Sequence, residues 1–439
     1  MRKVVLTLCF GLLVSAFTGS PLAAAEPLTA ARPNIVLIVS DDQHWGDYGF
    51  MQHPTVQTPN LDRLSRQGLL FTKGYVPASL CCPSLASLIT GLYPHEHGIT
   101  GNDPPNPKNL KGPDFHKSEA YRQGRQNMVE KMRNAPALPK LLAEEGYLSL
   151  QTGKWWLEHF SNGGFTHGMS LGGRHGDVGL KIGRETMQPI DDFLDVAQKE
   201  KKPFFLWYAP MLPHQPHNPP ERLLQKYVDK TASIQQARYW ANVEWFDETC
   251  GQLLDTLDRR GLSDNTVVVY LGDNGWIQDQ DKPHFAPKSK QSPNDGGLRT
   301  PIIIRLPGKV SPGRDDVHRV SSLDIAATVL RLAGHAPVAA QSGIDLLDAE
   351  AVAARHALYG ACFTHDFVDL DDPVKNLRFR WMIEDDWKLI VPSATEGGLP
   401  QLFDLAKDPH EENDLAGTEK KRIEDLLPKL DKFLQTGNR

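Results

Sequence analysis

Cysteine is scarce in this sequence, and no long apolar run follows its N-terminal segment. The 439 residues include five cysteines, and one of them, Cys9, lies in that segment. The other four are too few for a disulfide framework in a chain long enough to be stabilised by its core. Cys81 and Cys82 are adjacent and hard to bridge to each other, so at least one of them can be reserved for chemistry. The lack of a bilayer-length apolar stretch predicts no stable membrane anchor.

Neither sign of charge dominates the sequence. Lys and Arg number 48 against 54 Asp and Glu, which gives a formal net charge of −6. This mild acidity, without a dense run of Lys or Arg, predicts no nucleic-acid partner. Internal repeats and low-complexity tracts are also missing. The 40% hydrophobic and 23% charged residues are ordinary for a globular protein, and they exclude disorder, collagen and coiled coil.

The N-terminus has the pattern of an export signal. Arg2 and Lys3 precede an apolar run over residues 4–17, and small residues suited to cleavage stand at 23–25. The alternative, an uncleaved membrane anchor, is disfavoured because the run is short and interrupted by glycine. Residues 1–25 are therefore predicted to be a signal peptide of a periplasmic or secreted protein.

Three apolar runs rich in β-branched or aromatic residues each end in polar residues or proline. They cover residues 34–40, 204–208 and 266–271, with helical stretches such as 60–68 and 135–146 between them. Continuous apolar strands are typical of parallel sheets buried on both faces. The pattern predicts an α/β fold with a large doubly wound, mostly parallel sheet flanked by helices. Ligands of such sheets bind beyond the carboxyl ends of the strands.

The pattern changes in the last quarter of the chain. Short strand candidates and a charged terminal helix occupy residues 378–384, 387–391, 401–405 and about 419–435. These elements predict a smaller α+β subdomain with a small antiparallel sheet. The predicted boundary separates a large α/β domain at 26–345 from this subdomain at 346–439.

Oxygen-bearing side chains follow two of the buried strands. Asp41 and Asp42 come directly after the first, and Asp273 and Asn274 come just after another. In a parallel sheet both pairs converge at one edge. Carboxylate and amide oxygens suit Ca²⁺, or Mg²⁺, better than Zn²⁺. The alternative is that these residues only cap helices or form turns.

The segment 79–91 predicts a helix that begins near a cysteine. Pro83 suits a first helical turn, apolar residues form one face, and Gly91 ends the helix. Cys81 is thereby expected just outside the helix N-terminus, where free N–H groups attract anions and lower the pKa of a thiol. Cys81 is a candidate nucleophile, and the alternative is a buried structural cysteine.

The run from Cys81 to Gly91, followed by Tyr93-Pro94-His95 and His97-Gly98, resembles the signature of type I sulfatases, within the alkaline-phosphatase-like superfamily. The resemblance spans nearly the whole chain after residue 25. Its further motifs are Asp41-Asp42, Gly153-Lys154-Trp155, Pro213-His214, Gly272-Asp273-Asn274-Gly275, Lys290 ahead of Asp295-Gly296-Gly297 with Arg299 and Pro301, Leu402-Phe403-Asp404-Leu405 and Asp408-Pro409-His410-Glu411.

The resemblance implies a role for each matching residue. Cys81 would be converted to formylglycine by a formylglycine-generating maturation enzyme, and the hydrate would attack the sulfur of a sulfate ester. The implied Ca²⁺ ligands are Asp41, Asp42, Asp273 and Asn274, together with the modified Cys81. Lys154 and Lys290 would neutralise sulfate oxygens, and His214 with Lys290 would protonate the leaving alkoxide. Fixed cations and an acid at these points act on charge that develops in the transition state.

Two positions depart from the family pattern. Leu85 stands where the family has an arginine that serves both maturation and the nucleophile, and Trp156 stands where it has a histidine that contacts the formylglycine hydroxyls. His159, Arg174 and Arg184 are the residues that could compensate.

The predicted function is an exported sulfatase that hydrolyses a small-molecule or oligosaccharide sulfate ester, on a sulfated carbohydrate or an aryl sulfate. The alternatives are a phosphate or phosphonate ester hydrolase of the same superfamily and a catalytically lapsed protein that binds a sulfated glycan. Pocket-wall candidates lie in residues 163–184, with His167, Arg174 and His175 as substrate-binding residues, although a plain surface loop is equally compatible.

Two further features are open. Trp207 and Trp276 stand beside predicted strand ends and either stack on a sugar ring or pack in the core. The polar, basic and Pro-rich segment 103–133 is either a surface insertion or part of the substrate pocket.

Overall fold

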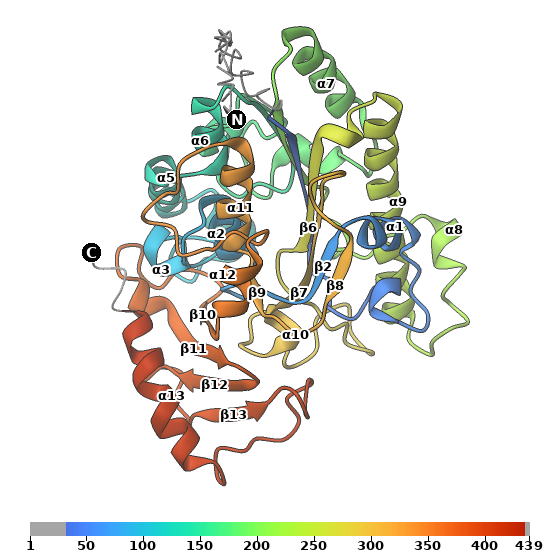
Figure 1. The fold of residues 1–439 in the computed structure, drawn as a ribbon. Helices are drawn as coiled ribbons and strands as arrows, with labels where there is room; N and C mark the ends of the chain where they lie inside the picture. Colours follow the sequence, from blue (N-terminus) through green and yellow to red (C-terminus); the bar gives the residue numbers. More distant parts are fainter. Residues whose placement is uncertain (1–31, 435–439) are drawn as a thin grey trace, which may run out of the picture. The chain divides into compact units, whose positions relative to one another are not determined.

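A mixed β-sheet is the central element of the structure, a computed structural model that describes residues 32–434 (Figure 1). Its strand order is β4-β3-β5-β1-β6-β7-β2-β8, and β9 pairs with β2 beside β8. The bounds are β1 Asn34–Ser40, β2 Leu69–Tyr75, β3 Leu148–Gly153, β4 His167–Gly168, β5 Phe204–Ala209, β6 Thr266–Gly272, β7 Arg299–Arg305, β8 Gly313–Asp315 and β9 Val320–Ser321. Strands β4, β3, β5, β1 and β6 are mutually parallel, and β7 runs antiparallel to β6 and β2. The predicted mostly parallel α/β sheet is confirmed.

Helices cover both faces of this sheet because the central strands are apolar on both sides. Ile35 and Leu37 of β1 pack in one core with α2, α5, α6 and α11, whereas Val36 and Ile38 pack in a second core with α1, α7 and α9. The helices are α1 Pro59–Gln67, α2 Cys81–Thr90, α3 Pro94–His97, α4 Gly112–His116, α5 Glu119–Asn134, α6 Leu138–Glu144, α7 Gln188–Glu200, α8 Glu221–Leu224, α9 Ile234–Arg259, α10 Asp295–Leu298, α11 Asp324–Ala333, α12 Ala349–Ala354 and α13 Lys420–Phe433. This alternation of apolar side chains is what a doubly wound sheet requires.

The segment 103–133 contains more regular structure than its composition indicates. The helix α5 begins at a Ser118 cap whose hydroxyl accepts the N–H of Tyr121. Its buried face includes Tyr121, Met128 and Met132, at spacings of seven and four residues. These spacings fit one face of a helix, although most residues of the segment are polar. The spacing of the apolar residues was therefore more informative than the overall composition.

The C-terminal part forms a separate four-stranded antiparallel sheet with α13 packed on it (Figure 1). Its strands are β10 Ala357–Phe363, β11 Leu377–Glu384, β12 Trp387–Pro392 and β13 Gln401–Asp404. The last three strands and the helix confirm the predicted elements, and β10 was not predicted. Trp381 and Phe403 of this sheet share a core cluster with Tyr75 and Leu298 of the large sheet and α10. The domain boundary at 345 stays a prediction.

Predictions were also made for the N-terminus, for membrane anchoring and for the cysteines. The predicted signal peptide lies outside the described residues. None of the helices in residues 32–434 is both long and apolar enough to cross a bilayer. All four cysteines in the described range are buried with free thiols.

Buried His97 makes the stability of the fold sensitive to acid. The N–H of Ile99 donates to its Nδ1 (3.1 Å), and Ser87 Oγ lies 3.0 Å from its Nε2, a pattern that suits the neutral ring. Burial lowers the pKa of His97 to about 3. The folded protein therefore binds fewer protons than the unfolded chain, and stability is lost as pH falls below about 6.5.

We expect wild type to lose about 2 kcal/mol more than His97→Gln between pH 6.5 and pH 5, at about 1.4 kcal/mol per pH unit. Urea unfolding at the two pH values measures this difference, because glutamine does not titrate. Equal losses in the two proteins would contradict the assignment.

Candidate active site

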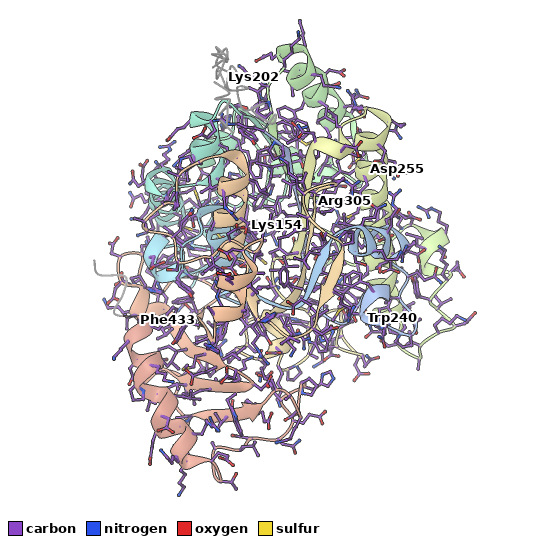
Figure 2. All side chains as sticks on the ribbon, in the orientation of Figure 1. Lys154, Lys202, Trp240, Asp255, Arg305 and Phe433 are labelled. Atoms are coloured by element: carbon purple, nitrogen blue, oxygen red, sulfur yellow. The ribbon has the colours of Figure 1, made fainter. Side chains whose placement is uncertain are left out.

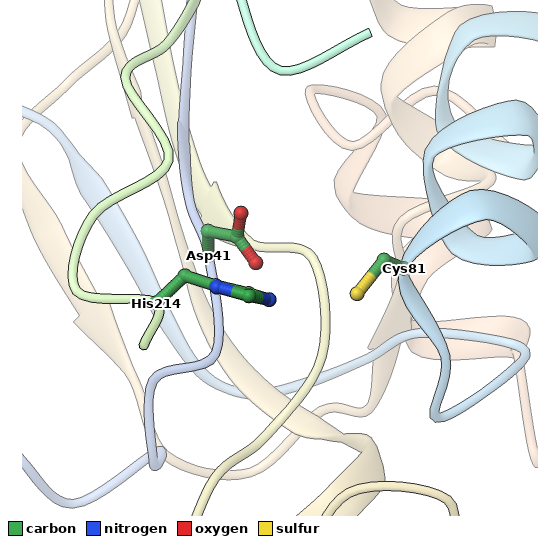
Figure 3. Close-up of side chains that lie close together, drawn as sticks. All are labelled: Asp41, Cys81 and His214. Atoms are coloured by element: carbon green, nitrogen blue, oxygen red, sulfur yellow. The ribbon is translucent and has the colours of Figure 1, made fainter. Parts of the chain in front are cut away.

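Polar and charged side chains from six segments meet at the carboxyl edge of the parallel strands. Asp41 and Asp42 follow β1, Lys154 follows β3, His214 follows β5, and Asp273 and Asn274 follow β6. Lys290 comes from the loop before α10, and Cys81 is the first residue of α2. Figure 3 shows Asp41 and His214 directed toward the thiol of Cys81 across a shared space. The structure thus brings all four predicted metal ligands, both lysines, His214 and Cys81 together.

Two buried lysines flank the thiol. The Nζ of Lys290 lies 2.6 Å from Asp42 Oδ1 and 3.1 Å from Cys81 Sγ. The Nζ of Lys154 donates to Asp41 Oδ1 (2.7 Å), and its side chain is only 1% exposed, within the body of the fold in Figure 2. A buried ammonium is stable only beside partners of opposite charge, so these lysines are part of the site and do not belong to the solvated surface.

Gly153 is required immediately before Lys154. It adopts a positive φ of 71°, and a Cβ at this position would lie 1.8 Å from the backbone oxygen of Ala209. The same oxygen accepts the N–H of Lys154 at 2.6 Å. Only glycine allows the end of β3 to approach β5 this closely, and this approach directs Lys154 into the site.

The charges of the cluster shift one another in opposite directions. Burial by itself would raise the pKa of Asp42, but Lys290 and His214 hold it well below its usual range. Burial, reinforced by Asp41, raises the pKa of Asp273. The carboxylates overcome burial to raise the pKa values of Lys154 and Lys290. The two lysines and Asp42 are therefore held in their charged forms, whereas Asp273 binds a proton more readily than a free carboxyl group.

The predicted low pKa of Cys81 is wrong. The residue lies within the helix as its first member, not just outside it, and it is 1% exposed. Burial raises its pKa to about 11 despite the nearby Lys154 and Lys290. Loss of hydration outweighs the helix terminus and the lysines here, so the unmodified thiol is a poor nucleophile at neutral pH.

His214 is held with one ring nitrogen facing the cluster. Its Nδ1 lies 2.5 Å from the backbone oxygen of Gln215, to which an N–H would donate. Its Nε2 lies 3.4 Å from Asp42 Oδ2. Burial lowers the pKa of His214. The neutral ring thus carries its proton on Nδ1 and presents Nε2 to the space shared with Cys81.

The oxygen atoms of this cluster fit a divalent cation. Asp41 Oδ2, Asp273 Oδ2 and Asn274 Oδ1 are buried, and none has a hydrogen-bond partner among residues 32–434. The other polar atom of each side chain is engaged: Lys154 donates to Asp41, the N–H groups of Asp42 and Asn274 donate to Asp273, and the Asn274 amide donates to Asp42. Buried oxygens left without a donor are costly unless a cation binds them. Three carboxylates and an amide suit Ca²⁺ or Mg²⁺.

The two positions that depart from the family pattern are buried in the same core. Leu85 and Trp156 both belong to the cluster between the sheet and helices α2, α5, α6 and α11. The guanidinium of Arg174 lies 4.6 Å from the centre of the Trp156 ring, and His175 meets that ring edge-on at 4.3 Å. Arg174 also forms a two-pronged ion pair with Asp103, at 2.6 and 3.0 Å. Trp156 therefore occupies the position at which the family has a histidine, and its ring packs against Arg174 and His175.

The other candidate residues lie elsewhere. His159 caps a short 3-10 helix through Ser161, and Arg184 is bound to the backbone oxygens of Pro210 and Met211. His167 lies beside Leu150 on the edge strand β4, with its ring against Phe193, so it is not part of this cluster. Of the three compensating residues considered, Arg174 is close enough to Cys81 for the two groups to interact electrostatically.

Neither Trp207 nor Trp276 has an exposed ring face on which a sugar could stack. Trp207 is fully buried and donates its ring N–H to the backbone oxygen of Lys154 (3.2 Å). Trp276 is 1% exposed and packs between His217, His284 and Phe285. Both pack in the core, which was the alternative interpretation. The centre of the Trp276 ring lies 5.8 Å from Lys290 Nζ, so the indole packs beside this ammonium group.

Two residues of the site were not singled out from the sequence. Asp103 begins the segment left open as insertion or pocket, and it fixes Arg174. Arg125 on α5 is 3% exposed and donates to the backbone oxygen of Trp156. This segment thus supplies two side chains that hold Arg174 and the backbone of Trp156. The helical period of α5 was the one local signal available, because both contacts join residues far apart in the chain.

The matching protein-family models and the matching relatives are sulfatases or related sulfohydrolases. The sequence matches the Sulfatase family over residues 33–335, and over residues 289–438 a second family described as N-sulphoglucosamine sulphohydrolase, C-terminal. It is 30% identical over 364 residues to N-acetylgalactosamine-6-sulfatase of Canis lupus familiaris, covering 72% of this chain and 66% of that protein. It is 29% identical over 379 residues to arylsulfatase A of Homo sapiens, covering 74% and 69%. The chain spans about two thirds of the length of these relatives.

Solved structures show the same fold. The crystal structure of Ps i-CgsB matches with a TM-score of 0.73 and 25% identity, over 93% of this chain and 94% of that one. The same protein in complex with k-i-k-neocarrahexaose matches with a TM-score of 0.72 and 24% identity, over the same shares of the two chains. Together with the match over residues 33–335, these findings show that the chain belongs to the sulfatase family.

Proposed function

We propose that this protein is an exported sulfatase that hydrolyses a sulfate ester of a carbohydrate, with Cys81 converted to formylglycine and Ca²⁺ bound by Asp41, Asp42, Asp273 and Asn274. The observation that carries the proposal is the convergence of Cys81, two buried lysines and three buried oxygens that lack a hydrogen-bond partner among the described residues. The export-signal pattern predicted over residues 1–25 supports a periplasmic or secreted location.

Two lysines would bind the sulfate group. Lys290 Nζ already contacts Cys81 Sγ at 3.1 Å, and Lys154 is held 2.7 Å from Asp41. Both ammonium groups keep their protons because the carboxylates raise their pKa values. In a buried site such fixed cations act most strongly on charge that develops in the transition state. A bound Ca²⁺ would supply further positive charge for the sulfate oxygens.

His214 and Lys290 would supply the proton for the leaving oxygen. The contact of His214 Nδ1 with Gln215 fixes the ring, and Nε2, which has no proton in the neutral ring, would take up the proton that the attacking hydroxyl of the hydrate loses and pass it to the leaving oxygen. Lys290 is protonated and reaches the same space. A leaving alkoxide needs a proton at the moment the S–O bond breaks, and both donors lie on the side of the cluster that faces Cys81.

The names of the relatives support a carbohydrate substrate. N-acetylgalactosamine-6-sulfatase is named for a sugar sulfate, and Ps i-CgsB was solved with a neocarrahexaose. The polar wall formed by Arg174, Asp103 and His175 is suited to hydroxyl and anionic groups of a sugar.

The test is the mass of the Cys81 peptide combined with sulfate release. Protein expressed in its native host is digested with trypsin, and the peptide is expected to carry an aldehyde in place of the thiol. The same preparation is assayed with matched sulfate and phosphate esters. An unmodified thiol, or turnover of the phosphate ester alone, would contradict the proposal, and so would binding of a sulfated glycan without sulfate release.

Arg174 is expected to contribute to substrate binding more than to bond cleavage. Its guanidinium is about one-third exposed and is shared between Asp103, Trp156 and His175. Replacing it with methionine removes the cation and keeps an apolar contact with Trp156. We expect KM for an anionic sulfated sugar to rise about 10-fold with kcat changed less than about threefold. Steady-state kinetics measure this effect.

The matched control for that substitution is Arg122→Met. Arg122 is an exposed arginine that pairs with Glu119 on the same face of α5. The control should leave KM unchanged, and the unfolding temperature of both variants should be recorded because Asp103 loses its partner in the first. An unchanged KM in Arg174→Met would exclude the assigned role.

A further inference from the structure

The motif Asp408–Glu411 lies in the C-terminal part of the chain, and the proposed reaction does not use it. It follows β13 as a turn, in which Asp408 accepts the N–H groups of Glu412 (3.0 Å) and Asn413 (2.7 Å). This turn directs Glu411 inward, where its side chain is 1% exposed. A carboxylate is rarely buried unless it is paired, so the contacts of Glu411 indicate its role.

The buried carboxylate of Glu411 contacts a backbone N–H group and a lysine, and its backbone oxygen contacts a second lysine. Its Oε2 accepts the backbone N–H of Asp295 (2.7 Å), and its Oε1 lies 2.8 Å from Lys388 Nζ. Its backbone oxygen accepts a hydrogen bond from Lys288. Lys388, from β12, also donates to Asp295 Oδ1 (2.7 Å), and Tyr75 donates to Asp295 Oδ2 (2.9 Å). One buried ammonium thus joins two buried carboxylates from different parts of the chain.

These contacts fix the catalytic loop on both sides of Lys290. Lys288 precedes Lys290 by two residues and Asp295 follows it by five, and Glu411 binds both. Within the loop of residues 288–295, the backbone adopts left-handed conformations at Lys288 (φ 57°) and Gln291 (φ 64°). Non-glycine residues keep such conformations only where the surroundings hold them.

The same turn also reaches the metal-ligand loop. The ring of His410 stacks on Trp45, with ring centres 5.7 Å apart. Trp45 follows Asp41 and Asp42 by only a few residues. The turn after β13 therefore contacts two of the loops that build the site, although it comes from the separate C-terminal sheet.

We infer that Glu411, with Lys388, is a positioning residue that fixes the loop carrying Lys290 against Cys81, so that the C-terminal sheet is part of the catalytic apparatus. The inference rests on the proposed function because it concerns the placement of Lys290. A lysine side chain is long and flexible, and a misplacement of about 1 Å can reduce turnover about 100-fold. The buried pairing supplies the rigidity that the lysine lacks.

The experiment compares Glu411→Ala with Leu430→Ala. Leu430 is fully buried in the cluster between α13 and the C-terminal sheet, and the 288–295 loop is outside that cluster, so its truncation destabilises the same subdomain. We expect Glu411→Ala to raise hydrogen exchange of the amides in residues 288–295 by about 10-fold or more. We expect its kcat for a sulfate ester to fall about 10- to 100-fold, with KM changed less than about threefold.

Two milder variants keep the test open should Glu411→Ala fold poorly. Glu411→Gln retains an oxygen for the Asp295 N–H, and it is expected to restore kcat to within about threefold of wild type. Lys288→Met removes the hydrogen bond that this exposed side chain donates to the backbone oxygen of Glu411 and leaves the Glu411 carboxylate in place. It is expected to lower kcat about threefold with a smaller rise in exchange.

The inference is overturned if exchange and kcat in Glu411→Ala match those of wild type, or if Leu430→Ala reproduces both changes. Hydrogen exchange is measured without substrate, so it reads the loop independently of the reaction. A wild-type protein that releases no sulfate would refute the proposed function, while the exchange comparison would still decide whether Glu411 fixes the loop.

Discussion

Replacing Cys81 with alanine is expected to abolish sulfate release, by at least about 1,000-fold in kcat/KM. The side chain lies 3.1 Å from Lys290, and among the described cysteines it alone lies within ligand range of Asp41 and His214. Its unmodified thiol is a weak nucleophile because burial raises its pKa to about 11. Under the proposed function, activity depends on the conversion of this residue to formylglycine, and alanine cannot be converted.

The control for this substitution is Cys82→Ala. Cys82 is the next residue of α2, equally buried, and burial raises its pKa to about 12. Neither site lysine contacts its sulfur through a hydrogen bond in the part of the chain that the structure describes. We expect the control to keep its activity within about threefold and to unfold at a similar temperature. Equal activity in Cys81→Ala and wild type would refute the proposed mechanism.

Calcium is expected to stabilise the wild-type protein and to have no such effect on Asp273→Asn. Three buried carboxylates and an amide lie at one point, and Asp41 Oδ2 and Asp273 Oδ2 have no hydrogen-bond donor among residues 32–434. A ligand that binds only the folded state at 100 times its Kd adds about 2.7 kcal/mol to the free energy of unfolding. Thermal unfolding with CaCl₂ and with a chelator measures this gain.

The substitution removes one negative charge from the cluster, so the variant should lose the calcium response and most of its turnover, about 100-fold or more. The matched control is Asp247→Asn, a buried carboxylate on α9 that accepts the N–H groups of Asn60 and Leu61. That variant should unfold at a lower temperature but respond to calcium like wild type. A calcium response in Asp273→Asn equal to that of wild type would show that Asp273 is not a ligand.

Local sequence patterns predicted the main elements of the fold because their signal is short-range. The strand over residues 34–40 was predicted with the bounds that β1 has, and the predicted strands 204–208 and 266–271 each extend by one residue. Fully apolar runs of this length identify strands buried on both faces. The helix α5 was missed because its polar composition concealed its buried stripe.

Part of the site was also predictable, because residues that directly follow strands are recognised from local sequence patterns. Aspartates that follow parallel strands meet at one edge whatever the details of packing, and the structure brings Asp41, Asp42 and Asp273 to within ligand distance of one another. Local sequence patterns did not predict which residues remote in the chain contact one another directly. Asp103 and Arg174 are 71 positions apart, and Lys290 and Cys81 are 209 positions apart. No local pattern encodes such pairs.

The sequence by itself determined the three central strands, most of the C-terminal elements, the polar residues at strand ends and the motifs that carry the family resemblance. Only the tertiary structure decided which of these groups are buried and what they face. Burial reversed the predicted pKa shift of Cys81 and made Lys154 a paired interior charge. It also brought Glu411 to the loop of Lys290. The physical reason is that hydration and Coulomb energies depend on distances through space, and folding sets those distances between residues that are remote in the chain.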